Sequence, residues 1–299
     1  MDLSTTWDSV PKKRTERRNK LAVDRRRPSG HFFNPVMDGQ FEVFYRRFWN
    51  MSELLATVQD RSQRSRARRV LVYGTHGIGK SSFAASAPNP LVLDLEDGLG
   101  DIEVASSPKI SRVADLMGWI TELYEKDHDW KTIVIDSVDW LERIIWSYTC
   151  EQHNKKAIED FGFGKGYKYA LENWSDVLEG LDALRNDKGM SVLLIAHSQT
   201  EKYENPETEP YDRYSPRLHK GASALVQEWC DEVLFACYRV HTTKDRGKSG
   251  ERHRGIGGEE RVLRTRERPF CLAKNRLNMP DEIPLSWDSY SEHWGKTNN

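Results

Sequence analysis

The chain has 299 residues, enough for one substantial hydrophobic core and little more. Its hydrophobic fraction of 37% and charged fraction of 30% are typical of a globular protein with polar extensions, and no apolar run approaches the roughly 20 residues that cross a bilayer. We therefore expect no membrane partner. The cysteines are far apart and lack metal-ligand spacing, as expected for reduced thiols of a cytoplasmic protein: Cys150, Cys230, Cys237 and Cys271.

The net charge of −1 is unevenly distributed along the chain. Residues 1–50 hold 11 Lys and Arg against 6 Asp and Glu, so the remainder is mildly acidic. This leader lacks helical or strand periodicity, and we expect it to be disordered, with a basic nucleic-acid arm as the alternative. If the remainder binds nucleic acid, local loops rather than bulk charge must do so.

A third interpretation is that the leader is not part of the native protein. Arg46-Arg47 can be encoded by AGG-AGG, a ribosome-binding sequence, and Met51 follows shortly after it. Met51-Ser52-Glu53-Leu54-Leu55 then reads as a natural start. The expected organisation is a leader over 1–50, a linker over 51–67, a core over 68–290 and a tail over 291–299.

From Arg68 onward, short apolar runs alternate with amphipathic helical patterns. The predicted strands are Val70–Tyr73, Leu91–Leu95, Thr132–Ile135, Val192–Ala196 and Val233–Ala236. Helical patterns lie near 80–86, 111–127, 137–152, 167–187 and 221–230. Strands that are apolar on both faces and separated by helices predict an α/β fold, with a mainly parallel sheet covered by helices on both faces.

The alternation of apolar runs and helical patterns ends after the predicted strand Val233–Ala236. A Gly-, Lys- and Arg-rich stretch over 244–260 comes before two further strand-like runs, Arg261–Arg266 and Phe270–Ala273. These runs predict a C-terminal β-hairpin extension of the sheet.

The segment Gly74–Ser81 fits the pattern G-x-x-x-x-G-K-[ST], between a predicted strand and a predicted helix. Its glycines let backbone N–H groups surround phosphates, and the helix N-terminus adds partial positive charge. Lys80 is expected to reach the β and γ phosphates, and Ser81 to offer its hydroxyl to Mg²⁺. The sequence therefore predicts ATP and Mg²⁺ as cofactors, held by Gly74, Thr75, His76, Gly77, Ile78, Gly79, Lys80, Ser81 and Ser82.

Two further strands end in acidic residues, at the edge where ligands bind in open α/β sheets. Asp136 follows an apolar run, and we expect it to bind Mg²⁺ as the Walker B acid. The alternative role is that of an aspartate that caps the following helix, and the two roles are compatible. Glu96 is our candidate for the base that activates water. Its competitors are Asp94 and Asp97, and a solvated acidic turn is the alternative to any of them.

A fourth strand leads into His197 and Gln199. A polar group at this position is able to sense the γ-phosphate and to pass its presence to the following loop. Both residues qualify, and either would also serve simply to satisfy backbone groups.

The order of these parts resembles the RecA/RadA recombinase core. Other stretches resemble the phage-encoded RecA-like ATPases of the Sak single-strand-annealing group, often described only as AAA-family ATP-binding proteins: Ser86–Pro90, Asp136–Glu142, Phe161–Tyr167 and Ala273–Arg276. The resemblance runs from about residue 51 to residue 287. It implies a RecA-like P-loop ATPase that is stimulated by DNA and supports phage homologous recombination by annealing or strand exchange, in the cytoplasm of a bacterial host.

The resemblance also assigns individual roles. It gives Glu96 the catalytic position and Gln199 the position of the γ-phosphate-sensing glutamine, while His197 is closer to the RadA version. Lys274 and Arg276 match the start of a RadA Lys-Asn-Arg-Phe-Gly motif whose cations reach the ATP of a neighbouring subunit. The next two residues depart from that motif, and without the resemblance both cations would be ordinary strand-end residues.

Two predicted loops carry the residue types that bind single-stranded nucleic acid. The first, Phe161–Tyr169, combines glycines, aromatic rings and lysines; the alternative is a connection between helices whose aromatic rings pack inward. The second, Thr200–Gly221, is long and polar, and we expect a structureless loop that ATP orders around DNA. The candidates are Phe163, Lys165, Tyr167, Lys168, Arg213, Arg217 and Lys220.

The expected partners are single-stranded DNA, further copies of the chain in a ring or filament, and a single-strand-binding protein. The main alternative is an ATPase motor or loader that acts on a replication protein such as a helicase. A small-molecule P-loop kinase is disfavoured because no obvious Arg-rich lid follows the core. A binding module that never turns over ATP is a further alternative.

Overall fold

A computed structural model describes residues 67–247 and 250–294 of the chain. The chain divides into two units, Met1–Gln59 and Asp60–Asn299, and every described residue belongs to the second. The expectations for the basic leader, for a start at Met51 and for most of the linker therefore lie outside the described residues, as do the last five residues of the chain.

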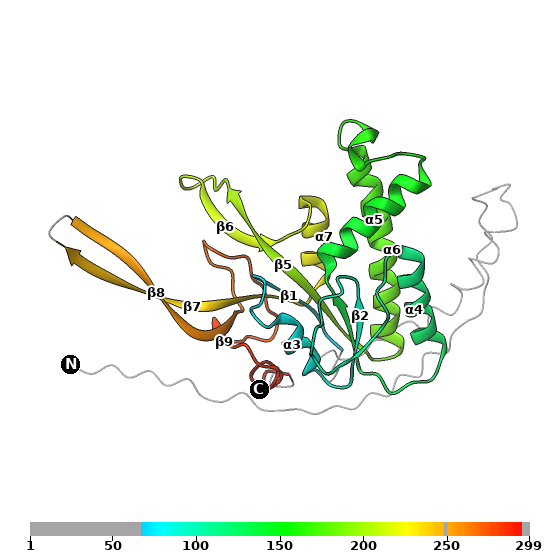
Figure 1. The fold of residues 1–299 in the computed structure, drawn as a ribbon, viewed down its shortest axis with the longest axis horizontal. Coiled ribbons are helices and arrows are strands. Elements are labelled where there is room, and N and C mark those ends of the chain that lie inside the picture. The colour runs from blue at the N-terminus through cyan, green and yellow to red at the C-terminus, as the bar shows by residue number, and fades with distance from the viewer. Residues whose placement is uncertain (1–66, 248–249, 295–299) are drawn as a thin grey trace, which may run out of the picture. The chain divides into compact units, whose positions relative to one another are not determined.

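Strands and helices alternate along most of the described chain (Figure 1). In chain order the elements are β1 (Arg69–Gly74), α3 (Lys80–Ala85), β2 (Pro90–Asp94), β3 (Ala105–Ser106), α4 (Val113–Glu125), β4 (Thr132–Asp136), α5 (Val138–Gln152), the 3-10 helix η3 (Ile158–Phe161), α6 (Lys165–Asp187), β5 (Ser191–Tyr203), β6 (Tyr211–Pro216), α7 (Lys220–Trp229), β7 (Glu232–Gly247), β8 (Gly250–Arg264), β9 (Glu282–Pro284) and α8 (Trp287–Ser291).

The described strands form one sheet in the order β3-β2-β4-β5-β1-β7-β8-β9, with β6 paired to the far end of β5. The pairings from β3 to β7 are parallel, and those of β7 with β8, β8 with β9 and β5 with β6 are antiparallel. The mainly parallel, helix-covered α/β fold is therefore confirmed. It agrees with the predicted RecA-like P-loop core.

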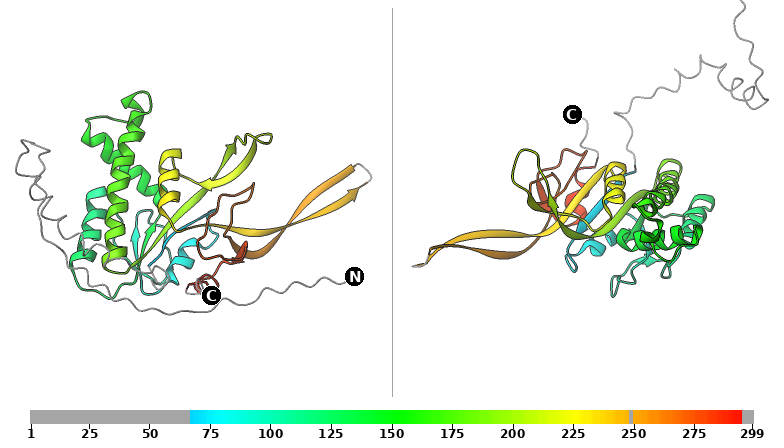
Figure 2. Two further views of the ribbon diagram at one scale, coloured as in Figure 1. Left: turned by 180° about the vertical axis from the view of Figure 1, so that it is seen from behind. Right: turned by 90° about the horizontal axis from the view of Figure 1, so that it is seen from above.

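The sheet separates two apolar layers, because successive side chains of a strand point to opposite faces. In β1, Leu71 and Tyr73 pack in the layer under α4, α5, α6 and α7, whereas Val70 and Val72 pack in the layer under α3 and α8. Figure 2 shows these helices on opposite sides of the strands. Burial on both faces explains why the central strands read as continuous apolar runs.

The C-terminal segment closes the second layer through aromatic rings. Trp287 and Tyr290 of α8 contact Phe83 of α3 at ring-centroid distances of 5.4 and 5.8 Å. Trp294, in the segment expected as a tail, packs edge-on against Trp287 at 5.4 Å. These contacts attach α8 to the helix that follows the phosphate-binding motif.

The five strands and five helices predicted in the parallel core all form. The predicted pairing partner of the C-terminal hairpin is wrong. β7 continues past Ala236 to Gly247 and pairs with β8, whereas the predicted strand Phe270–Ala273 makes only single bridge pairs, such as Tyr214 with Cys271. Glycine and charged residues are depleted in strands, so the composition of 244–260 concealed a hairpin that backbone pairing nevertheless forms.

The prediction of a structureless loop over Thr200–Gly221 is also wrong. β5 continues to Tyr203, and β6 returns alongside it as the second strand of a hairpin. Cross-strand partners include Glu201 opposite Arg213 and Tyr203 opposite Tyr211, which are charge and aromatic pairs that stabilise antiparallel strands. The polar composition of these strands, in which even the buried positions of β6 include Arg213 and Ser215, hid them from the sequence.

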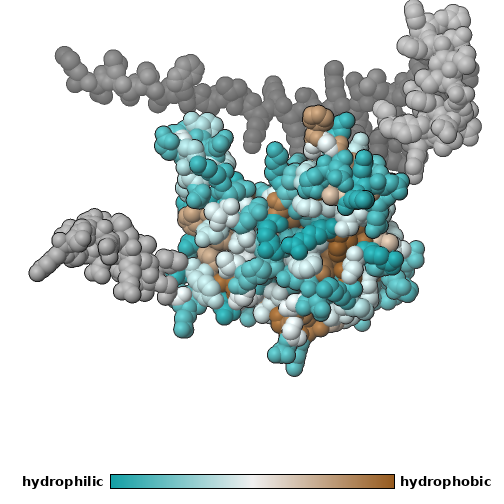
Figure 3. Space-filling view, turned by 45° about the horizontal axis from the view of Figure 1, so that its top comes forward, coloured by the Kyte–Doolittle hydropathy of each residue, from teal (hydrophilic) through white to brown (hydrophobic). Residues whose placement is uncertain are grey.

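Three hairpins project from one end of the sheet (Figures 1 and 2). They are the helix pair α5–α6, the β5–β6 hairpin and the β7–β8 arm. The space-filling view shows a mostly hydrophilic face with small, separate apolar areas (Figure 3). Among the described residues, no helix is both long and apolar enough to span a membrane.

A glycine at the start of α6 provides a test of the helix pair. A Cβ on Gly166 would lie 2.3 Å from the Ile158 carbonyl oxygen, so we expect Gly166→Ala to lower the free energy of unfolding by about 2 kcal/mol through overpacking. In α4, a Cβ on Gly118 meets no described atom within 4 Å. Gly118→Ala should therefore raise the free energy of unfolding by about 1 kcal/mol, because alanine has the higher helix propensity. Urea unfolding followed by circular dichroism measures both. Equal effects of the two substitutions would contradict the packing.

A buried carboxylate at the start of β7 provides a pH test. Glu232 is fully buried beside Arg68 and Tyr290, and burial raises its pKa to about 7. The folded state holds this proton more tightly than the unfolded state, so the stabilisation is present below about pH 4.5 and is lost as the pH rises through 7. Glu232→Gln should therefore become more stable relative to wild type between pH 5 and pH 8 in urea titrations. The exposed Glu179→Gln serves as the control, and a constant difference for Glu232→Gln would refute the shift.

Candidate functional site

The phosphate loop connects the end of β1 to the start of α3. Gly77 and Gly79 adopt left-handed backbone conformations, with φ of 71° and 105°, which glycine tolerates without strain. Lys80 is buried, and its Nζ donates to the carbonyls of Gly74 at 3.1 Å and Thr75 at 2.9 Å. Burial lowers the pKa of Lys80, and nearby carboxylates led by Asp136 oppose that shift. The loop thus holds its cation at the place where phosphates would bind.

The hydroxyl of Ser81 and the carboxylate of Asp136 meet at the end of β4. The Ser81 Oγ donates to Asp136 Oδ2 at 2.6 Å. Burial raises the pKa of Asp136, and the hydrogen bond from Ser81 partly offsets the rise. A hydroxyl and a carboxylate oxygen are ligands that Mg²⁺ prefers, and the ion usually keeps several waters beside them. This oxygen donor set fits Mg²⁺.

The acidic turn after β2 presents one carboxylate to the loop. Asp94 Oδ1 accepts the backbone N–H groups of Glu96 at 3.1 Å and Asp97 at 2.7 Å, so this side chain holds the turn together. Asp97 is exposed. Glu96 Oε2 accepts from the Ser137 hydroxyl at 3.0 Å. Of the three acids proposed as the base, Glu96 lines the cavity of the phosphate loop.

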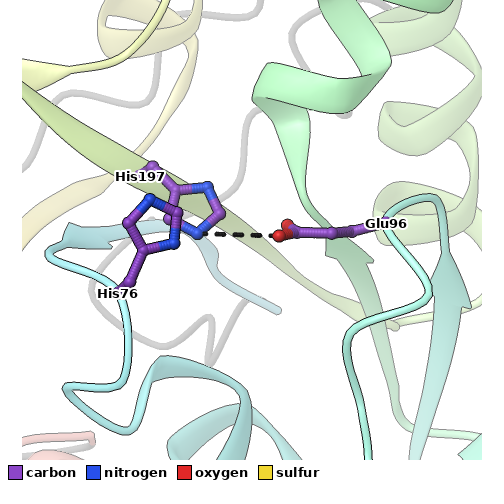
Figure 4. A group of neighbouring side chains, drawn as sticks. All are labelled: His76, Glu96 and His197. Carbon is purple, nitrogen blue, oxygen red and sulfur yellow. Dashed lines mark ion pairs between the residues drawn. The ribbon is translucent and has the colours of Figure 1, made fainter.

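His197 lies beside the phosphate loop, because β5 pairs with β1 in a register that sets His197 opposite Gly74. Its Nε2 is 3.8 Å from Glu96 Oε1, and its ring stacks on His76 with centroids 3.9 Å apart (Figure 4). Gln199, the other γ-phosphate sensor candidate, instead donates its Nε2 to the Leu218 carbonyl at 3.3 Å.

The buried carboxylate of Asp139 fixes the other side of the His197 ring. Its oxygens accept the His197 backbone N–H at 3.0 Å and lie 3.0 Å from the ring Nδ1, and Arg217 donates to it at 2.5 Å. Burial alone would raise the pKa of Asp139, but the hydrogen bonds from His197 and Arg217 outweigh burial and hold it well below its usual range. Asp139 therefore stays ionised and orients His197.

These groups surround a cavity of about 320 Å³ at the carboxyl edge of the sheet. Its lining residues are His76, Gly77, Gly79, Lys80, Ser81, Ser82, Glu96, Gly98, Ile102, Asp136, His197 and Arg261. A larger hollow of about 830 Å³ lies elsewhere, beside Arg213 and Lys274. The smaller cavity is the candidate nucleotide site, because it contains the phosphate loop and its acidic partners.

Comparison with known proteins places this site in a family. Residues 66–277, more than two thirds of the chain, match the family described as "AAA domain". The chain belongs to this family. It is therefore a P-loop ATPase by family.

Proteins similar to the chain include one curated relative and one solved structure. One is the SPbeta prophage-derived uncharacterized protein YorG of Bacillus subtilis (strain 168), 29% identical over 172 residues, which are 56% of this chain and 49% of that protein. The chain thus spans about half the length of this relative. The crystal structure of the RadB recombinase matches 75% of this chain and 90% of its own with a TM-score of 0.40 and 12% identity.

The two cations expected to act on a neighbouring subunit lie at the edge of the sheet opposite to the phosphate loop. Lys274 Nζ donates to the carbonyls of Gln227 at 2.9 Å and Cys230 at 2.8 Å. Arg276 pairs with Asp231 at 3.0 Å, just before β7 begins. Within one chain, both are held by groups at the amino edge of the sheet.

The DNA candidates divide into engaged and exposed residues. Arg213 is buried between Glu201 at 3.4 Å and Glu267 at 3.0 Å, and Arg217 is held by Asp139. By contrast, the remaining cations and one ring of the set are exposed: Phe163, Lys165, Lys168 and Lys220.

The first turn of α6 and the start of α7 meet through the remaining candidate. Tyr167 stacks on His219 with centroids 4.1 Å apart and donates its hydroxyl to Glu159 at 3.0 Å. His219 caps α7, and its backbone N–H donates to Glu142, whose pKa burial raises to about 7. The two segments predicted as separate DNA loops therefore adjoin.

Three polar residues that contact or line the site had no predicted role: Ser137, Asp139 and Arg261. Asp139 and Ser137 belong to the same short run as Asp136, and a carboxylate three residues after the Walker B acid, in the first turn of the following helix, was the signal available for Asp139. Arg261 comes from β8, and its Nη1 approaches Gly79 so closely that a Cβ there would lie 3.2 Å away. No local signal links β8 to the loop, because only the fold brings them together.

Proposed function

We propose that this chain is a Mg²⁺-dependent ATPase that binds single-stranded DNA and supports phage homologous recombination, by annealing or strand exchange, as in the Sak group. The convergence of Lys80, Asp136, Glu96 and His197 on the phosphate loop carries the hydrolytic part. An ATP phosphate chain in this loop would have a cation, an oxygen donor set and a candidate base within one cavity.

Each residue has a role in the proposed hydrolysis. Lys80 would exchange its loop carbonyls for β and γ phosphate oxygens. Ser81 and Asp136 would hold Mg²⁺, which neutralises phosphate charge when bound. Glu96 would orient the attacking water and accept its proton, and His197 would contact the γ-phosphate beside it. Asp139 would keep the His197 ring in place.

Two observations support the DNA part of the proposal. Lys165, Lys168 and Lys220 are exposed where α6 and α7 adjoin. Residues 237–256 of the β7–β8 arm hold six Lys and Arg against two Asp and Glu, so this arm is basic although the body of the protein is not. Clustered cations of this kind supply most of the sequence-independent affinity for a phosphate backbone.

The proposed function also implies a cellular setting and partners for the protein. The prophage origin of the similar Bacillus protein supports a phage role in the bacterial cytoplasm. Further copies of the chain would bring Lys274 and Arg276 to a neighbour's nucleotide, and a single-strand-binding protein would deliver the DNA. The competing function is a motor or loader on a replication protein, since a projecting β arm also suits protein contacts.

An ATPase assay with and without single-stranded DNA tests this proposal. We expect Mg²⁺-dependent turnover that DNA increases. Lys80→Ala should lower it about 100-fold by removing a cation from the transferring phosphoryl group. Glu96→Gln should lower kcat roughly 100- to 10,000-fold through loss of the base while nucleotide still binds. Stimulation by a replication protein but not by DNA would favour the loader instead.

The salt dependence of DNA binding tests the proposed surface. Each phosphate contact to a single strand contributes about 0.7 to the slope of log affinity against log salt, so Lys165→Ala with Lys168→Ala should lower the slope by about 1.4. Lys126→Ala with Lys188→Ala makes the same change in net charge elsewhere on the chain. Fluorescence anisotropy with labelled oligonucleotide measures both. Equal slopes for the two double variants would show that Lys165 and Lys168 of α6 do not contact DNA.

A further inference from the structure

Two histidines and a glutamate face one another at the mouth of the candidate nucleotide cavity. His76 comes from the phosphate loop, Glu96 from the turn after β2, and His197 from β5 (Figure 4). One ligand atom from each lies within 4.8 Å of the others. Three segments that are distant in the sequence thus bring two imidazole nitrogens and a carboxylate oxygen together.

This donor set differs from the one that suits magnesium. Mg²⁺ prefers oxygen ligands, which Ser81 and Asp136 provide, whereas two imidazoles and a carboxylate are typical ligands of Zn²⁺ and other first-row transition metals. The cavity therefore contains two adjacent sets of donors with different chemical preferences.

The surroundings of His197 match those of a metal-binding histidine. Such a ring usually gives its second nitrogen to a carboxylate, which orients the ring and increases its basicity. Asp139 Oδ2 lies 3.0 Å from His197 Nδ1, and this contact turns Nε2 toward Glu96. Arg217 also pairs with Asp139, on the Nδ1 side of the ring, away from the proposed ligand atom.

The third ligand, His76, lies on the exposed side of the cavity. The nearby carboxylates of Glu96, Asp136 and Asp139 are balanced by three cations, Lys80, Arg217 and Arg261. His76 is exposed on the loop, so its ring can turn from the stack on His197 to present a nitrogen.

We propose that His76, Glu96 and His197 form a binding site for one transition-metal cation of the Zn²⁺ class, separate from the Mg²⁺ donor set. Three protein ligands leave a fourth position for water or a phosphate oxygen. Occupancy takes the Glu96 carboxylate away from the attacking water, so the metal lowers ATP turnover. This consequence rests on the proposed function, whereas the binding site itself does not.

Titration of the full chain with Co²⁺, without nucleotide or Mg²⁺, tests the site, because Co²⁺ substitutes for Zn²⁺ and absorbs visible light when four-coordinate. We expect one equivalent to bind and Zn²⁺ to displace it. His76→Ala and His197→Ala should each weaken binding at least about 10-fold, and Asp139→Asn about 10-fold through the second nitrogen of His197. The matched control is His153→Ala, which removes an exposed histidine at the end of α5.

Circular dichroism of each variant shows whether it folds, and the exposed His76→Gln gives a second test if His197→Ala does not. Unchanged Co²⁺ affinity in both His76 variants would overturn the site. ATPase assays with added Zn²⁺ then test the consequence, with inhibition expected in wild type and weaker inhibition in His76→Gln relative to its own metal-free rate. A chain that binds Co²⁺ as expected but hydrolyses no ATP would refute the proposed function and leave the metal site standing.

Discussion

The parallel register of β1, β2, β4 and β5 determines where polar chemistry can occur in this protein. These strands are buried on both faces, so charged groups are tolerated only where the strands end. The register sets Gly74 opposite His197 and Asp94 opposite Asp136. The phosphate loop, the acidic turn and the end of β4 therefore converge at one edge, although long stretches of sequence separate them.

Convergence at that edge creates an electrostatic problem that hydrogen bonds solve. Lys80, Asp136 and Asp139 are all buried, and a buried charge is costly unless it is paired. Lys80 is held by backbone carbonyls, Asp136 by Ser81, and Asp139 by His197 and Arg217. The opposite pKa shifts of Asp136 and Asp139 follow from this pairing, because Asp139 receives more donors and one of them is a cation.

Local patterns in the sequence were sufficient for the parallel core and for the phosphate loop, because apolar runs and the glycine-lysine motif are complete within a few residues. They failed for the β5–β6 hairpin and the β7–β8 arm, whose strands are polar or rich in glycine and depend on pairing with each other. They also failed for Arg261, which reaches the loop only because β8 lies beside β7. What remained hidden was the part of the structure that long-range pairing creates.

The same register connects the cavity to the projecting hairpins. β5 passes through the site at His197 and continues directly into the β5–β6 hairpin, and Arg217 follows the last residue of β6. Asp139 holds both ends of this hairpin, through the His197 backbone and ring at one end and through Arg217 at the other. A ligand that moved the His197 ring would therefore disturb the contact that fixes the return strand. Because the carboxylate is buried and cannot be left unpaired without cost, the hairpin would have to adjust with it. The nucleotide site and the hairpin thus share the Asp139 side chain, in addition to the backbone hydrogen bond that Arg217 donates to the His197 carbonyl at 2.8 Å.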